Sequence, residues 1–476
     1  MDKLNSERLA PIQPSNAPGG IPKNDWLMRL RHTIGLDRAI AFTVLGRLFQ
    51  GMGSLVTVLL IVHLLTPAEQ GYYYALWSLV ALQAVFELGF SFVILQIAAH
   101  ERAHLQFHAD GSVSGSPIAH IRLASVLQRA VRWYAVAAVI MLVALLFGGS
   151  RFFATHQQHG FETTWVFPLR ITAMACAFTF LVGPVLSFLE GCGQVVPVAH
   201  TRFFQSIVST LAAWGAMLSH HALLAPAIVL ISMGGVASIL IYSRRSLLLP
   251  LLKLRTEKHA VSWRYEVWPF QWKIAVSWLC DYFIFQLFTP VLFAFRGPVE
   301  AGQMGVSMNI VLQMSGIMLA WMTTKSAPFG SLIAQKDIRG LDHLFFRTLW
   351  QSLALFCACA TSVLLGVCLI SRFMPNLGHR FVQWPVFLFL LLTALSSHVV
   401  QCEALYLRAH KCEPFLMQSI VVASCTATSV LLVAGPLGTI GVSGAYFLVL
   451  GVGGVISATL IFRYKRRYWA KSEAGQ

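Results

Sequence analysis

The chain has 476 residues, of which 57% are hydrophobic and only 11% are charged. Soluble domains carry roughly 25% charged residues, so this composition excludes an ordinary soluble protein and indicates an all-α protein that crosses a membrane many times. The net charge of +16 at pH 7 does not indicate a nucleic-acid partner, because the charges cluster in the connections between long apolar blocks.

The first 38 residues are polar and proline-rich and contain no cleavable signal peptide. They predict a cytoplasmic tail whose last part, residues 26–38, is basic and amphipathic and lies on the membrane surface. About twelve membrane-spanning helices are predicted after the tail, since a span needs about 20 apolar residues. Their approximate bounds are 39–65, 72–99, 131–149, 166–189, 200–218, 222–242, 274–294, 301–325, 348–370, 384–408, 414–433 and 438–462.

Lys and Arg residues are concentrated in the first tail, in the connection 243–273 and at the C-terminus. Because cytoplasmic connections carry an excess of these residues, both termini are predicted to be cytoplasmic. The basic connection divides the chain into two lobes of six spans. The predicted bounds are 1–38 for the first tail, 39–243 for the N-lobe, 244–273 for the linker, 274–463 for the C-lobe and 464–476 for the second tail.

A five-residue pattern occurs at the same place in both lobes. Residues 67–71 (PAEQG) and 298–302 (PVEAG) both read P-x-E-x-G, and each opens a span on the external side. The repetition favours a duplicated six-helix unit with a pseudo-twofold axis along the membrane normal, because both halves begin on the cytoplasmic side. Tyr72, Tyr73 and Tyr74, directly after the first copy, are predicted to lie in the interfacial aromatic belt.

The sequence around the first copy resembles a known family. Residues 65–72 read L-x-P-x-x-x-G-Y, the next helix carries Glu-Leu-Gly at 87–89, and residues 189–194 read LEGCGQ. These features resemble the polysaccharide transporters, including the O-antigen (Wzx-type) flippases, of the multidrug/oligosaccharidyl-lipid/polysaccharide exporter (MOP) superfamily. The resemblance implies two six-helix lobes that form a V around a central cavity, lined mainly by the first, second, seventh and eighth helices.

The resemblance also implies a function. It implies alternating access that moves an undecaprenyl-pyrophosphate-linked oligosaccharide from the cytoplasmic to the external leaflet of the bacterial inner membrane. The implied partners are this lipid-linked glycan and membrane lipids, with glycan polymerase or assembly proteins as further candidates, and the chain is expected to act as a monomer. No cofactor is expected, and coupling to a proton or sodium gradient is left open. The alternative is a cation-coupled multidrug exporter of the same superfamily, which would favour carboxylates over arginines in the cavity.

Charged residues lie within several predicted spans, and Arg47, Glu87 and Asp281 are the main candidates for a functional site, because a charge is costly there. Arg47 and Glu87 lie 21 and 19 residues from Ala68 in the first external turn, so they are predicted to lie at similar depth on antiparallel helices. Asp281 lies at comparable depth in the seventh span. We predict that Arg47 pairs with Glu87 or Asp281 in the cytoplasmic half of the cavity, where the pair either binds substrate or only fixes helix orientation.

Other polar residues complete the predicted site. A lipid pyrophosphate needs Arg or Lys, and sugars need uncharged hydrogen-bonding groups. The further cationic candidates, which could instead be structural or extend to lipid headgroups, are Lys325, Arg202 and Arg296. The uncharged candidates are Gln50, Gln83, Asn309 and Gln313. The candidates for a salt bridge that gates the cavity are Glu190, Glu403 and Arg408.

One motif favours a different class of protein. Residues 100–104 read H-E-x-x-H, which on a helix places two histidines on one face and could bind zinc in a membrane metalloprotease. The motif lies at a predicted helix end in a His-rich loop, and a chain with 16 His residues gives such a match by chance. We therefore predict a transporter rather than an enzyme, with no metal site.

Overall fold

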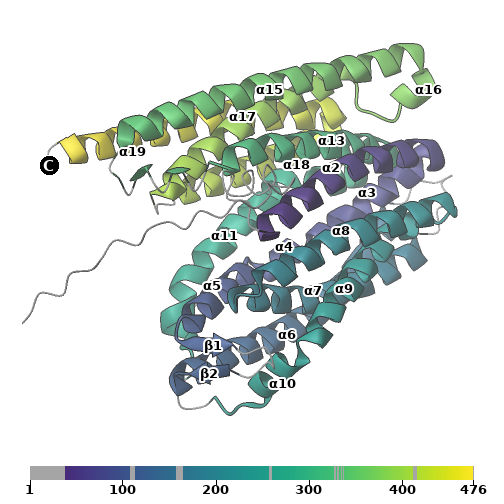
Figure 1. Ribbon diagram of the computed structural model, residues 1–476. Coiled ribbons are helices and arrows are strands. Elements are labelled where there is room, and N and C mark those ends of the chain that lie inside the picture. The colour runs from purple at the N-terminus through teal and green to yellow at the C-terminus, as the bar shows by residue number, and fades with distance from the viewer. Residues whose placement is uncertain are drawn as a thin grey trace, which may run out of the picture.

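The computed structural model describes residues 38–107, 113–156, 165–256, 260–410 apart from six positions between 326 and 336, and 415–474 (Figure 1). Most of these residues are helical, as the composition predicts. The part of the expected surface segment before residue 38 lies outside the described residues.

The first half of the chain forms the N-lobe and the linker. Its elements are α2 (Arg38–Leu64), α3 (Pro67–Ala81), α4 (Gln83–Glu87), α5 (Phe90–Arg102), β1 (Leu105–Phe107), β2 (Val113–Gly115), α6 (Pro117–Thr155), α7 (Val166–Gly191), α8 (Val195–Leu218), η1 (Ala222–Leu224), α9 (Ala225–Ser243), α10 (Arg245–Lys253) and η2 (Trp263–Val267). β1 and β2 pair as an antiparallel hairpin, with Gln106 opposite Ser114.

The second half forms the C-lobe. Its elements are α11 (Trp268–Phe285), α12 (Phe288–Arg296), α13 (Pro298–Thr323), α15 (Ile338–Phe373), α16 (Pro375–Gly378), α17 (Trp384–Ala409), α18 (Leu416–Tyr446), η3 (Phe447–Gly454) and α19 (Val455–Ala474). The stretch from residue 464 onward, expected to be a tail, continues α19 as a helix. There Arg466 donates hydrogen bonds of 2.7–3.0 Å to Asp342, and the ring of Trp469 stacks on that of His410 at 4.0 Å.

The expected spans fall on helices, but a count of twelve is not confirmed. By length and hydropathy, eight described helices could cross a membrane, or ten if two bent pairs each count as one span. The bent pairs are Pro67–Glu87 with Phe90–Arg102, and Gln271–Phe285 with Phe288–Arg296. Helix α8 is not among those that qualify, and the last two expected spans form one run, Leu416–Trp469, in which Gly438 has non-helical dihedral angles.

The helices form two lobes that meet along α2, α3 and α13. Helix α2 packs on α8 of the N-lobe, and α3 packs on α13 of the C-lobe. Figure 1 shows the lobes converging near α16 and diverging toward the β1–β2 hairpin and the end of α19. We call these ends the convergent side and the basic side, the latter because it carries Arg244, Lys253 and Arg467. The V-shaped arrangement expected from the family resemblance is therefore present.

The three consecutive tyrosines of α3 lie in the contact between the lobes. At most 6% of Tyr72, Tyr73 or Tyr74 is exposed. The ring of Tyr72 packs against Phe153 of the N-lobe at 5.4 Å and against Phe293 of the C-lobe at 5.1 Å. The prediction that they belong to an interfacial belt is wrong, because both lobes cover the start of α3.

Both copies of the P-x-E-x-G pattern begin a helix, α3 and α13, with proline in the first turn. In α3 the side chains of Thr66 and Glu69 also form a capping box. The two copies touch each other: a Cβ on Gly71 would lie 1.9 Å from the carbonyl oxygen of Pro298, and one on Gly302 would lie 2.8 Å from the backbone nitrogen of Gly71. Only glycine allows two backbones to come so close, so the duplicated pattern builds the contact between the lobes.

The Glu-Leu-Gly segment breaks the second span. Leu88 and Gly89 both have left-handed dihedral angles, with φ of 51° and 66°, and the helix bends there by 44°. A Cβ on Gly89 would lie 2.3 Å from Cγ2 of Ile274 on α11, and Gln271 of α11 donates a 2.7 Å hydrogen bond to the Leu88 carbonyl. The break thus supplies a carbonyl acceptor and a close approach that hold α11 of the C-lobe against the N-lobe.

The basic linker is docked on the N-lobe. Gln128 of α6 donates hydrogen bonds to the carbonyls of Leu251 and Leu254 at 2.9 and 2.8 Å. The backbone nitrogen of Val261 donates to the hydroxyl of Ser125 at 3.1 Å. The linker is therefore part of the N-lobe up to the start of α11.

Arg122 joins this linker to the lobe. It pairs with Glu101 of α5 at 2.8 Å and with Glu266 of η2 at 2.5 Å, and only 4% of Glu101 is exposed. The hydrogen bond from Arg122 lowers the pKa of Glu266. A carboxyl whose pKa is lowered by folding stabilises the fold above its unfolded pKa and loses that contribution as the pH falls through the folded pKa. The docking of η2 should therefore weaken only in acid.

Replacement of Arg122 by alanine is expected to destabilise the N-lobe by about 3–5 kcal/mol, because the buried Glu101 carboxylate loses its counter-charge. The measurement is thermal unfolding of the purified protein in detergent at neutral pH. Arg132→Ala removes an exposed arginine from the same helix and should cost no more than about 0.5 kcal/mol. Adding Glu101→Gln to Arg122→Ala should recover much of the loss, and equal melting temperatures for the two arginine variants would contradict the assignment.

Candidate functional site

The lobes are sealed together on the convergent side. Besides the glycine contact, Arg380 donates a 2.5 Å hydrogen bond to the Leu65 carbonyl, and the buried Gln70 donates one of 3.0 Å to the Arg380 carbonyl. Gln303 of α13 donates to the carbonyl of His379 at 2.8 Å. These bonds tie α2, α3 and α13 to the segment between α16 and α17, so this side closes the space between the lobes.

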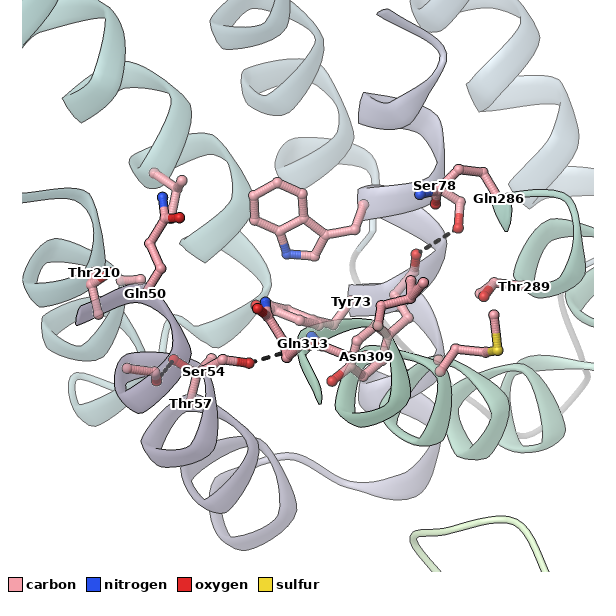
Figure 2. A pocket seen from close by; sticks show the side chains of 18 of the residues that line it. Gln50, Ser54, Thr57, Tyr73, Ser78, Thr210, Gln286, Thr289, Asn309 and Gln313 are labelled. Atoms are coloured by element: carbon pink, nitrogen blue, oxygen red, sulfur yellow. Dashed lines mark hydrogen bonds between the residues drawn. The ribbon is translucent and has the colours of Figure 1, made fainter. Parts of the chain in front are cut away.

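A central cavity of about 510 Å³ lies between the lobes (Figure 2). Helices α2, α3, α11, α12 and α13 line it, as the family resemblance implies, and α8 and α9 complete its wall. None of the described residues that line it carries a charge. The polar and aromatic ones are Gln50, Ser54, Thr57, Tyr73, Tyr74, Trp77, Ser78, Ser209, Thr210, Phe285, Gln286, Phe288, Thr289, Asn309 and Gln313.

Three glutamine amides of the cavity make no hydrogen bond within the described part of the chain. The side chains of Gln50, Gln286 and Gln313 form no hydrogen bond with any described residue, although each offers two donors and one acceptor. By contrast, Ser54 donates a 3.2 Å hydrogen bond to Asn309 and so joins α2 to α13 across the cavity, as Figure 2 shows. The cavity therefore presents uncharged hydrogen-bonding groups that the described residues leave available to a ligand.

Arg47 lies just outside the cavity on the same face of α2. Gln50, Ser54 and Thr57 follow it by 3, 7 and 10 residues, a spacing that returns to one side of a helix. Its side chain is exposed and makes no ion pair or hydrogen bond with the described residues. One helical turn of about 5 Å separates it from Gln50, in the direction of the basic side.

The predicted pairing of Arg47 with Glu87 or Asp281 is not present. Glu87 lines a smaller cavity of about 290 Å³ inside the N-lobe, together with Gln83 and Arg202. Asp281 lines a different cavity, of about 320 Å³, inside the C-lobe. The prediction placed all three at one depth, but depth along a helix does not determine the direction in which a side chain faces.

The other candidates of the N-lobe are engaged within that lobe. Arg202 pairs with Glu190 at 2.7 Å, and Gln83 donates to the carbonyl of Cys176 at 2.8 Å and to the hydroxyl of Thr179 at 3.1 Å. Gln83 therefore has a structural role here, and Arg202 is not exposed to the central cavity.

The predicted gate is also not formed in this structure. Glu190 is paired inside the N-lobe, whereas Glu403, which is 4% exposed, accepts a 2.9 Å hydrogen bond from Thr459 inside the C-lobe. Arg408 lines the C-lobe cavity with Asp281. These residues come from the diverging ends of the lobes, so they do not meet across the gap.

The two remaining cationic candidates lie away from the central cavity. Arg296 ends α12 and pairs with Glu300 at 3.2 Å, beside the contact on the convergent side. Lys325 follows the end of α13 and lines neither the central cavity nor the two lobe cavities.

The lobe cavities support the duplication of the fold. Gln205 of α8 donates a 2.8 Å hydrogen bond to the carbonyl of Met233. Gln418 of α18 donates one of 2.7 Å to the carbonyl of Gly454. Each glutamine lines the cavity of its own lobe and joins the fifth expected span of that lobe to the sixth.

The H-E-x-x-H motif, residues 100–104, lies at the C-terminal end of helix α5 and extends just beyond it. Its Glu101 carboxylate is bound by Arg122 at 2.8 Å, and the rings of His100 and His104 lie 6.1 Å apart. Within the described residues no group of three or more His, Cys, Asp or Glu side chains could hold a metal ion.

Comparison with known proteins identifies the fold. No family model and no curated protein sequence matches the chain. Among solved structures, the chain is similar to the lipid II flippase MurJ in its inward closed conformation, with 14% identity, a TM-score of 0.61, and coverage of 90% of this chain and 87% of that one. It is also similar to the inward-facing conformation of a multidrug resistance MATE family transporter, with 11% identity, a TM-score of 0.57, and coverage of 88% and 99%.

A MATE crystallised with MaD3S is similar at 13% identity, with a TM-score of 0.54 and coverage of 92% of this chain and 98% of that one. The chain thus shares its overall fold with these MATE and MurJ structures, and its many long apolar helices mark it as a multi-pass membrane protein.

Proposed function

We propose that the chain is a flippase that moves an undecaprenyl-pyrophosphate-linked oligosaccharide from the cytoplasmic to the external leaflet of the bacterial inner membrane by alternating access. The central cavity is the observation that carries this proposal. Its described lining offers amides, hydroxyls and aromatic rings, and three of its amides make no hydrogen bond with described residues. Amides and hydroxyls hydrogen-bond to sugar hydroxyls, and aromatic rings pack against the apolar faces of sugar rings.

The proposed orientation places the basic side and both termini in the cytoplasm, because Lys and Arg are concentrated there. The seal between Arg380, Leu65 and Gln70 then closes the external side. Arg47 lies on the cytoplasmic side of the cavity, where its guanidinium can form two parallel hydrogen bonds to a phosphate. The pyrophosphate is held near Arg47 while the glycan extends into the cavity and the lipid tail stays in the bilayer.

The second candidate is a cation-coupled multidrug exporter. Glu87 favours it, because a carboxylate inside the N-lobe cavity is suited to binding a proton or a metal cation. The uncharged central cavity does not favour it, since a cationic drug would find no carboxylate among the described lining residues. Coupling to a cation at Glu87 is compatible with either substrate.

The test uses the purified full-length chain in proteoliposomes. An undecaprenyl-pyrophosphate-linked oligosaccharide is placed in the membrane, and its appearance in the opposite leaflet is followed with a membrane-impermeant lectin. We expect transfer by the chain alone, without a glycan polymerase, and no uptake of a cationic dye under a proton or sodium gradient. Gradient-driven dye uptake with no glycolipid transfer would reverse the choice between the two candidates.

A further inference from the structure

We propose that the glycan carried by this chain is uncharged in the part that enters the central cavity, with the pyrophosphate as the only anionic group that the protein recognises. This inference rests on the proposed flippase function and adds the chemical class of the glycan.

Among the described residues, the charged side chains lie outside the lining of the central cavity. The nearest charge on α2 is Arg47, one turn outside, and the acids Glu87 and Asp281 lie in other cavities within the lobes. Arg202 forms an ion pair with Glu190, and Arg296 forms one with Glu300. A carboxylate or phosphate on the glycan would therefore meet only dipoles in the central cavity.

Desolvating an ion without a partner is costly, whereas desolvating a hydroxyl is offset by one or two hydrogen bonds. The amides of Gln50, Gln286 and Gln313, which no described residue engages, can both donate to and accept from neutral hydroxyls. Trp77 and Tyr73 add an apolar ring surface with a polar edge. This set is matched to a neutral sugar and penalises an acidic one.

The size of the cavity limits how many sugars of the glycan can contact its wall at one time. Its volume of about 510 Å³ lies in the range of pockets that enclose small ligands, so it holds only part of a long oligosaccharide. The sugars nearest the pyrophosphate enter first, because Arg47 is adjacent to Gln50 on α2. The selection against charge therefore applies to the sugars close to the lipid.

The experiment compares two undecaprenyl-pyrophosphate trisaccharides that differ only in one sugar, a neutral hexose or the corresponding hexuronic acid, in proteoliposomes of the full-length chain. We expect the neutral substrate to be transferred and the acidic one to be transferred at least tenfold more slowly. Gln313→Lys should reduce this preference at least fivefold, and Gln313→Glu should increase it. Gln50→Lys provides a second site if a variant at position 313 is not recovered as folded protein.

The outcomes separate the inference from the function on which it rests. Equal transfer of both trisaccharides, or faster transfer of the acidic one, would overturn the inference and leave the flippase function standing. A tenfold preference that neither lysine variant changes would show that the selection is made outside the cavity and would also overturn it. Transfer of neither trisaccharide would overturn the flippase function and the inference with it.

Discussion

Gly71→Ala is expected to reduce export about 100-fold. The added methyl carbon would lie 1.9 Å from the carbonyl oxygen of Pro298, so α3 and α13 would have to separate on the convergent side. Overpacking typically costs about 1–3 kcal/mol. The clash here is between backbones, so we expect the upper end of that range, which corresponds to about a 100-fold loss of the sealed conformation. Initial rates of glycolipid transfer in proteoliposomes measure the effect.

A matched control is Gly148→Ala on α6, where a Cβ would meet no atom within 4 Å, and it should transfer substrate at the normal rate. The accessibility of the central cavity from the convergent side gives a second measurement of the effect of Gly71→Ala. In a background without the native cysteines, a cysteine replacing Ser54 should react faster with an impermeant maleimide from the convergent side when Gly71 is substituted, because the outward-open conformation is then more populated. Normal transfer by Gly71→Ala, with no faster labelling of this cysteine, would show that the lobe contact is not needed for transport.

Arg47→Ala is expected to lower transfer about 10- to 100-fold, because one charge-assisted contact contributes about 1.5–3 kcal/mol. Arg47→Lys should be intermediate, since lysine keeps the charge but cannot form the paired hydrogen bonds of a guanidinium. The loss should be similar for neutral and acidic glycans, because both carry the same pyrophosphate.

Arg132→Ala controls for the removal of an exposed arginine and should transfer substrate normally. Thermal unfolding separates transport from stability: Arg47 makes no ion pair or hydrogen bond with the described residues, so its loss should leave the melting temperature nearly unchanged. Normal transfer by both Arg47 variants, at normal protein levels, would remove Arg47 from the mechanism.

Helix periodicity explains which site residues could be found in advance. Gln50, Asn309 and Gln313 are uncharged polar residues inside apolar runs, a pattern that indicates a cavity or a helix contact, and all three line the central cavity. Gln286 carries the same signal at the break between α11 and α12 but is absent from the predicted site. Tyr73 is predicted at the membrane interface, because a position near a span end is typical both of that interface and of a contact between lobes.

The orientation of Glu87 explains why the predicted pair with Arg47 is absent. Counting residues from the first turn gives the depth of Glu87 along its helix but not the direction of its side chain. Glu87, at the end of α4 and just before the 44° bend at Leu88 and Gly89, lines the cavity of the N-lobe and does not pair with Arg47. The Glu-Leu-Gly pattern carries a signal for this bend, since Gly favours positive φ, whereas the residue type of Leu88 does not indicate its positive φ.

The sequence by itself determined the class of molecule and its duplication. Long apolar blocks predict spans because apolar side chains suit the core of the bilayer, and the spans are helical because an unpaired backbone is too costly in lipid. The repeated P-x-E-x-G pattern marks two equivalent helix starts. Only the tertiary structure decided that these two starts touch, that Arg380 helps to seal them, and that the central cavity has no charged wall among the described residues. The physical reason is that burial and pairing depend on how each helix is rotated and bent against its neighbours, and that information is spread over contacts between segments more than 200 residues apart, such as Ser54 with Asn309.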